Sequence, residues 1–166
     1  MIHVIDTSAF LFIRDCVRVD CYAATLNDLT DLIRDGGLTF PREVVDDLQN
    51  CAKEETLDTW IKAVATDRTI TAVPYSNVQW VLGQCPSLCD PDAMSDSPTE
   101  VAAFGRAIDK NGDEFHIVTE DWTEKPTRMS LAAACEIMSC VTEDVREFLT
   151  CVGLENHLRP PTTGHS

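Results

Sequence analysis

Short runs of β-branched and aromatic residues alternate along this chain with longer segments that have helical periodicity. Three such runs, Ile2–Ile5, 38–40 and Phe115–Val118, have the length and composition of buried strands. The segments between them carry apolar residues three and four positions apart, as amphipathic helices do. Because a connection between parallel strands has room for a helix, this alternation predicts an α/β fold. We expect a three-layer sandwich in which a central, mostly parallel sheet is flanked by helices.

Turn and capping residues indicate where the helices begin and end. A pair of glycines ends a helix over Tyr22–Arg34. Ser97 as the cap, followed by a proline and by Glu100 three positions after the cap, is a capping-box pattern that begins another helix, which runs to about residue 108. The other expected elements are helices over 9–13, from Pro41 onward, over 56–65, 75–82 and 128–138, and over 143–151 with Thr142 as cap; short strands at 69–73 and 139–141; and a loop over 83–97.

The length of the chain, and a composition that does not change along it, indicate a single domain. The chain has 166 residues, of which 44% are hydrophobic, and contains neither an internal repeat nor a linker. We expect the domain to cover residues 1–153 and a loose, proline-containing tail to cover 154–166. No apolar run is long enough to cross a bilayer, and the first residues do not resemble a signal peptide. We therefore expect a cytoplasmic protein with no membrane contact.

The chain is strongly acidic. It has 28 Asp and Glu residues against 13 Lys and Arg residues, a formal net charge of −15. Such a surface repels polyanions, which excludes nucleic-acid binding by bulk charge. A surface rich in Asp and poor in Lys is typical of proteins that stay soluble in concentrated salt, where charges are screened over a few ångström. The composition therefore predicts a halophilic protein, from an archaeal cytoplasm.

The eight cysteines and four histidines do not have the spacing of a zinc site. The cysteines contain no pair separated by two residues, so a zinc knuckle is not indicated. In a reducing compartment we expect them to be buried thiols of the core. His3 and His116 fall inside the predicted strands, which favours a hydrogen-bonded structural role for both.

Acidic residues follow two of the predicted strands. Asp6 comes directly after the first strand, and Asp121 comes shortly after Phe115–Val118. In a parallel sheet both positions lie at the same edge, where the following helices also begin, so Asp47 and Glu100 can point toward it. Four carboxylates gathered there repel one another and require a counter-charge. Oxygen ligands of this kind select Mg²⁺ or Mn²⁺ over Zn²⁺.

In the order and surroundings of these acids the chain resembles the PIN-domain nucleases. The resemblance covers about residues 1–153 and rests on four short motifs. These are Ile5-Asp6-Thr7-Ser8 at the end of the first strand, Val44-Val45-Asp46-Asp47-Leu48 in a helix, Glu100 with Ala103 and Ala107 in a later helix, and Val118-Thr119-Glu120-Asp121 at the end of a strand.

This resemblance implies a metal-dependent endoribonuclease that hydrolyses RNA phosphodiester bonds, as in the VapC-type toxins of toxin–antitoxin pairs. It implies one Mg²⁺ or Mn²⁺ ion held mainly by Asp6, Glu100 and Asp121, and a second ion nearer Asp47. The partners that it implies are RNA, an antitoxin protein and a second copy of the chain. The neighbouring hydroxyls are then candidates for hydrogen bonds to the carboxylates or to phosphate, and they belong to Thr7, Ser8 and Thr119.

Several of these residues have alternatives. Asp96 precedes the same helix as Glu100, and Glu43 lies one turn before Asp47. Asp6 also has the position of a helix cap. The main alternative function is a catalytically inactive PIN-like scaffold that serves as a protein or RNA interaction module. A receiver-type phosphoacceptor domain is a more distant alternative, because its adjacent acids after the first strand and its late lysine are absent here.

Overall fold

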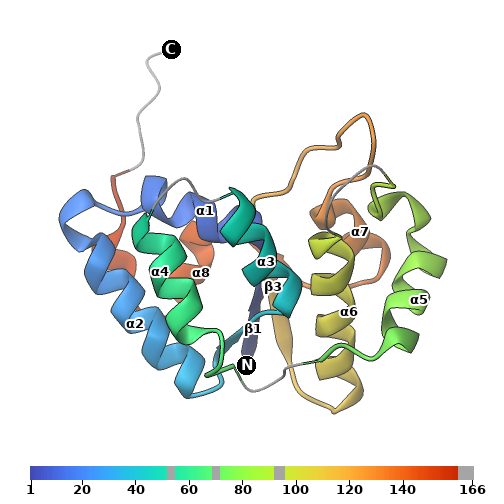
Figure 1. The fold of residues 1–166 in the computed structure, drawn as a ribbon, viewed down its shortest axis with the longest axis horizontal. Coiled ribbons are helices and arrows are strands. Elements are labelled where there is room, and N and C mark those ends of the chain that lie inside the picture. The colour runs from blue at the N-terminus through green and yellow to red at the C-terminus, as the bar shows by residue number, and fades with distance from the viewer. Residues whose placement is uncertain (52–54, 69–71, 92–95, 161–166) are drawn as a thin grey trace.

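The computed structural model describes residues 1–51, 55–68, 72–91 and 96–160. These residues form an α/β fold around a sheet of four parallel strands, with helices on both sides (Figure 1). The predicted fold class is therefore confirmed. The strands lie in the order β2-β1-β3-β4 and have these bounds: β1 (Ile2–Ile5), β2 (Leu38–Thr39), β3 (Phe115–Val118) and β4 (Thr142–Glu143).

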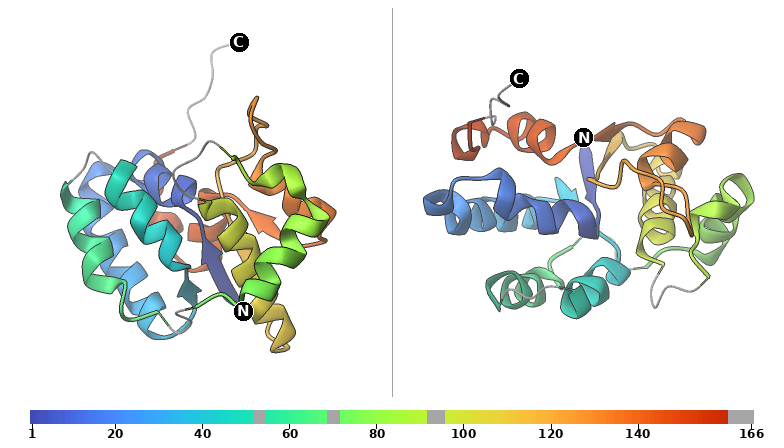
Figure 2. Two further views of the ribbon diagram at one scale, coloured as in Figure 1. Left: turned by 45° about the vertical axis from the view of Figure 1, so that its right-hand side comes forward. Right: turned by 90° about the horizontal axis from the view of Figure 1, so that it is seen from above.

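Eight α-helices occur within the described residues. They are α1 (Thr7–Cys16), α2 (Tyr22–Arg34), α3 (Arg42–Cys51), α4 (Glu55–Val64), α5 (Tyr75–Gln84), α6 (Ser97–Lys110), α7 (Leu131–Ile137) and α8 (Val145–Cys151). Three short 3₁₀ helices, η1 (Val19–Cys21), η2 (Pro86–Leu88) and η3 (Glu155–His157), join or follow them. Helices α1, α2 and α8 lie on one side of β1, and α5, α6 and α7 lie on the other (Figure 2).

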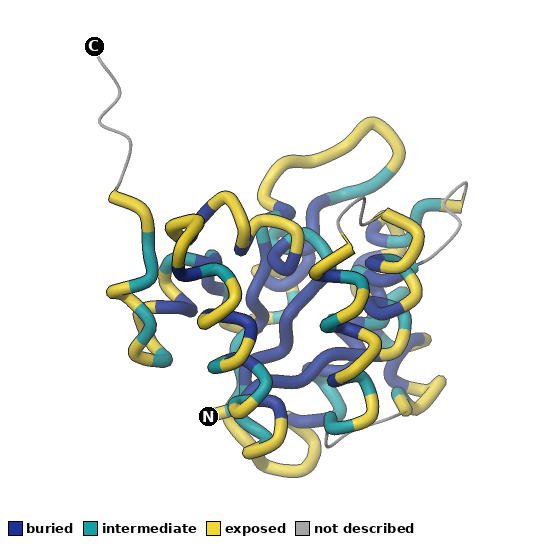
Figure 3. The backbone as a smooth tube through the Cα atoms, turned by 60° about the vertical axis from the view of Figure 1, so that its left-hand side comes forward, coloured by how far each residue is buried: buried dark blue, intermediate teal, exposed yellow. Residues whose placement is uncertain are grey.

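The central strands are buried between these helices (Figure 3). On one face, α6 packs against β3 so closely that a Cβ atom added at Gly105 would lie 2.4 Å from the Phe115 ring. On the other face, the rings of His3 and Phe148 have centroids 5.0 Å apart, which joins β1 to α8. All eight cysteines are free, and four of them (Cys16, Cys21, Cys85 and Cys135) are buried as expected, whereas Cys51 and Cys151 are exposed.

The chain between α7 and α8 differs from the prediction. The strand expected at 139–141 lies instead at Thr142–Glu143, beside β3, and Thr142 does not cap the next helix. Asp144 is the cap: its side chain accepts a 2.8 Å hydrogen bond from the Glu147 backbone N–H, and the Glu147 carboxylate accepts from the Asp144 N–H. This reciprocal pair sets the start of α8 after Asp144, so Glu143 belongs to the sheet.

Three other elements differ from the prediction. The first residue of α6 is Ser97 itself and its cap is Asp96, so the expected capping box of Ser97 is wrong. Helix α7 begins after Ser130, whose hydroxyl accepts from the Ala133 N–H, and not at residue 128. Of the strand expected at 69–73, residues 69–71 lie outside the described residues, and 72–73 are not in a strand.

The packed part of the chain continues past the predicted boundary at residue 153. The backbones of Val17 and Leu158 form an antiparallel bridge. Arg159 donates from its backbone to the Cys16 carbonyl at 2.9 Å and from Nε to the Val17 carbonyl at 2.6 Å. Residues 154–159 therefore belong to the domain. In the described parts of the chain, no helix has the length and apolar character needed to span a membrane.

Candidate functional site

A pocket of about 500 Å³ lies at the edge of the sheet where β1 and β3 end. Its wall comes from the start of α1, the C-terminal half of α3, the start of α6 and the loop after β3. We call it the strand-edge pocket. It is lined by Asp6, Thr7, Ser8, Leu11, Asp47, Asn50, Cys51, Ser97, Pro98, Asp121, Lys125 and Arg128.

Asp6 is a buried carboxylate that lines this pocket. It caps α1 by accepting a 2.8 Å hydrogen bond from the Ala9 N–H, and it also accepts from the hydroxyls of Ser8 and Thr119, each at 2.8 Å. Burial raises the pKa of Asp6 to about 6 against the effect of these bonds, and the negative charge of Asp121 adds to the increase. Asp6 therefore both caps α1 and lines the pocket.

Asp121 is buried close to Asp6 and is held by positive groups. Arg128 donates from Nη1 to Asp121 Oδ2 at 2.7 Å, and the Leu131 backbone N–H donates to the same oxygen at 2.9 Å. Lys125 Nζ lies 3.7 Å from Asp121 Oδ1. Sequence reasoning missed both cations, because they lie in an irregular loop, where their spacing from Asp121 does not predict a contact.

Asp47 reaches the pocket from α3, which lies between α1 and α6 (Figure 1). Thr7 donates from its hydroxyl to Asp47 Oδ2 at 3.3 Å, and the same hydroxyl lies 3.1 Å from Ser97 Oγ. Thr7 therefore joins the three helices that surround the pocket. Of the two acids considered on α3, Asp47 lines the pocket and Glu43 is not among its lining residues.

Glu100 is placed in a different group. It does not line the strand-edge pocket, and its charged neighbours are Glu43 and Asp96. Burial raises the pKa of Glu100 to about 7, and the charges of Glu43 and then of Asp96 add to the increase. The structure thus brings together Asp6, Asp47 and Asp121, and it groups Glu100 with the two residues that were considered as alternatives.

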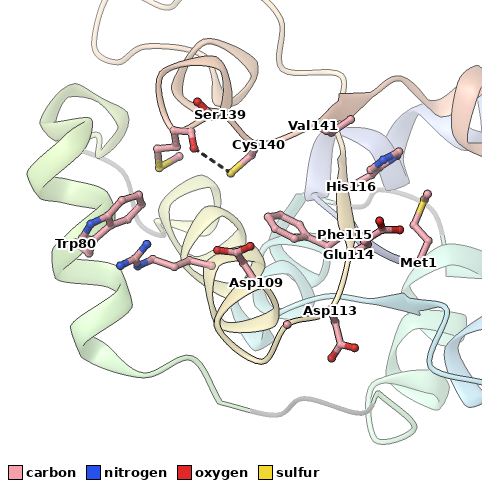
Figure 4. A pocket seen from close by; sticks show the side chains of 13 residues that line it. Met1, Trp80, Asp109, Asp113, Glu114, Phe115, His116, Ser139, Cys140 and Val141 are labelled. Carbon is pink, nitrogen blue, oxygen red and sulfur yellow. Dashed lines mark hydrogen bonds between the residues drawn. The ribbon is translucent and has the colours of Figure 1, made fainter.

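A second pocket, of about 490 Å³, lies near the beginning of β3 and holds none of the predicted site residues (Figure 4). The Arg106 guanidinium stacks 3.5 Å above the centre of the Trp80 ring at its wall. Met1, Phe115 and His116 border the same space. This cation–π pair joins α5 to α6 and is explained by the packing of the two helices.

Sequence reasoning also missed a group of possible metal ligands on the sheet itself, formed by His3, His116 and Glu143. The two histidines are neighbours across β1 and β3, which the predicted strand alignment could have indicated. Glu143 was missed because it was predicted to begin a helix.

No protein-family model matches this chain, and no curated protein matches it at a significant level. The resemblance to the PIN-domain nucleases therefore stays a prediction.

Proposed function

We propose that this protein is a metal-dependent endoribonuclease that hydrolyses RNA phosphodiester bonds in the strand-edge pocket. The observation that carries the proposal is that Asp6, Asp47 and Asp121, from three distant segments, line one pocket of about 500 Å³. Oxygen ligands of this kind suit Mg²⁺ or Mn²⁺. We also propose an antitoxin partner and a homodimer, and this part of the proposal rests only on the resemblance to PIN-domain nucleases.

The chemistry of the carboxylates fits a divalent cation. Asp6 is 3% exposed, and its raised pKa reflects both burial and the charge of Asp121. A nearby cation would favour the ionised form of both groups. We propose that Asp6 and Asp121 hold the ion and that Asp47 faces them from α3. A bound ion of this class would supply an activated water and offset the charge that develops on phosphate.

The other residues of the pocket have roles that follow from their contacts. Ser8 and Thr119 both donate to Asp6, so they fix the orientation of its carboxylate. Thr7 holds Asp47 in the same way. Lys125, whose side chain is 55% exposed, supplies positive charge for an RNA phosphate close to the pocket, since the chain as a whole is negative. Arg128 is largely buried and is paired with Asp121.

The first test is cleavage of a labelled single-stranded RNA with Mn²⁺ in concentrated KCl. We expect Asp6→Asn to lower the rate at least about 100-fold, since loss of a partner that merely supports a ligand already costs 10–100-fold. Asp20→Asn, which changes an exposed acid on η1, serves as the control and should retain the wild-type rate. Equal cleavage by wild type and Asp6→Asn would contradict the proposal.

The inactive scaffold remains the second candidate because of one contact. Arg128 already neutralises Asp121 through a 2.7 Å bond, as an internal cation in place of a metal would do. Calorimetric titration with Mn²⁺ separates the two functions. A nuclease should bind Mn²⁺ in wild type and lose that binding in Asp121→Asn, whereas a scaffold should give the same weak signal for both proteins.

A further inference from the structure

We propose that His3, His116 and Glu143 form a site for a transition-metal ion, with Zn²⁺ as the expected occupant. One nitrogen of each histidine and one carboxylate oxygen of Glu143 all lie within 4.8 Å of one another. The Nδ1 atom of His3 contacts Glu143 Oε1 directly, and the Nδ1 atom of His116 lies 3.5 Å from Glu143 Oε2. One carboxylate therefore faces two imidazoles that come from neighbouring strands.

The observation that points most directly to a ligand concerns the His116 ring. Its Nδ1 atom is buried and, among the residues that the structure describes, makes no hydrogen bond. A buried polar atom of this kind costs free energy unless water or an ion satisfies it. Because this nitrogen is directed at the carboxylate that His3 already contacts, an ion between the three groups would satisfy all of them.

The donor set selects the class of metal. Two imidazole nitrogens and one carboxylate oxygen suit Zn²⁺, whereas Mg²⁺ prefers oxygen ligands alone. Around a tetrahedral Zn²⁺ ion with bonds of about 2.0–2.1 Å, the ligand atoms lie about 3.4 Å from one another. The His3 and Glu143 atoms that now touch would therefore move apart, and ligand atoms at the 4.8 Å limit would approach by somewhat more than about 1 Å, which side-chain rotation can supply. Three protein ligands leave a fourth position for water.

The site is distinct from the strand-edge pocket. His3 lies three residues before Asp6 on β1, a separation of about 10 Å along a strand. His3 and Glu143 are buried, 5% and 6% exposed, whereas His116 also borders the second pocket (Figure 4). The proposed site shares no residue with the strand-edge pocket, so it does not depend on the proposed nuclease chemistry.

The location indicates what the ion does for the fold. β4 is an edge strand of only two residues, and Glu143 is one of them. Bonds from one ion to Glu143, His3 and His116 would fasten β4 to the two central strands. We expect Zn²⁺ to raise the thermal midpoint of the full chain, because a ligand that binds only the folded state stabilises it.

The test is calorimetric titration of the metal-free protein with Zn²⁺ in the presence of excess Mg²⁺, which occupies oxygen-only sites. We expect one Zn²⁺ per chain, and about 100-fold or greater weakening in His116→Gln and in Glu143→Gln. His116→Gln is the milder change because the ring is partly exposed. His157→Gln, in which a histidine bonded to Thr25 is replaced, is the matched control and should bind Zn²⁺ as wild type does.

Cobalt supplies an independent reading of the ligands. Co²⁺ bound by nitrogen and oxygen should give visible absorption without a strong thiolate band in the near ultraviolet. A thiolate band would assign the ion to the cysteines and overturn the proposal. So would Zn²⁺ binding that persists unchanged in His116→Gln, or the absence of Zn²⁺ binding by the folded wild type.

Discussion

Which carboxyl groups of this protein meet depends on where the backbone places each of them. Asp6 and Asp121 could be predicted to meet because the ends of adjacent parallel strands share an edge. The choice between Asp47 and Glu43 could not be predicted, since it depends on how α3 is rotated against its neighbours. Arg128 was equally inaccessible to sequence reasoning, because an irregular loop brings it back to Asp121.

Glu100 gives a prediction at this scale. Its pKa is raised from 4.5 to about 7, so the folded state holds the proton more tightly than the unfolded state. The stability from this group is therefore fully present below about pH 4.5 and is lost as the pH rises through about 7. We expect Glu100→Gln to increase the free energy of unfolding by about 1–2 kcal/mol near pH 8, after allowance for solvent screening, and to change it little near pH 4.

Urea unfolding at the two pH values, in the presence of a chelator, measures this effect. Glu136→Gln, at an exposed position on α7, is the control and should give a difference that does not depend on pH. A Glu100→Gln difference that is equally independent of pH would show that Glu100 ionises normally in the folded protein.

At the scale of helices and strands, the accuracy of prediction followed the strength of local signals. β1 and β3 are short, mostly apolar runs that are each followed by a polar residue, and their predicted limits are confirmed. β4 is polar and two residues long, and it is a strand only because it pairs with β3, which no local pattern expresses. Because β4 was not predicted, Glu143 was not expected to lie beside His3 and His116, with which it forms the group that we propose as a metal site.

The contact between α6 and β3 gives a prediction at this scale. A methyl group at Gly105 would lie 2.4 Å from a ring carbon of Phe115, so Gly105→Ala forces the ring or the helix to move. We expect it to lower the free energy of unfolding by about 1–3 kcal/mol. Gly83→Ala on α5 is the matched control: no atom lies within 4 Å of the added Cβ, and alanine should stabilise the helix by up to about 1 kcal/mol.

Thermal or urea unfolding of the two variants gives the comparison. Equal stabilisation by both substitutions would mean that α6 stands farther from the sheet than the contact between Gly105 and Phe115 implies.

For the molecule as a whole, charge is the dominant property. The net charge of −15 produces repulsion that only counter-ions can reduce, and in molar salt the screening length falls to about 3 Å. We expect the midpoint of thermal unfolding, followed by circular dichroism, to rise between dilute buffer and molar KCl. A protein that is fully folded in dilute buffer and gains nothing from KCl would contradict the halophilic interpretation.

The backbone bridge between Val17 and Leu158 has a practical consequence for handling the protein. Leu158 and Arg159 fasten the last described residues to the far end of α1, about 15 Å along that helix from Asp6. A tag or a surface anchor attached after them would leave the mouth of the pocket free. Shortened chains should end no earlier than residue 160, because a chain that ends at 153 would lose the contacts of Leu158 and Arg159 with the end of α1.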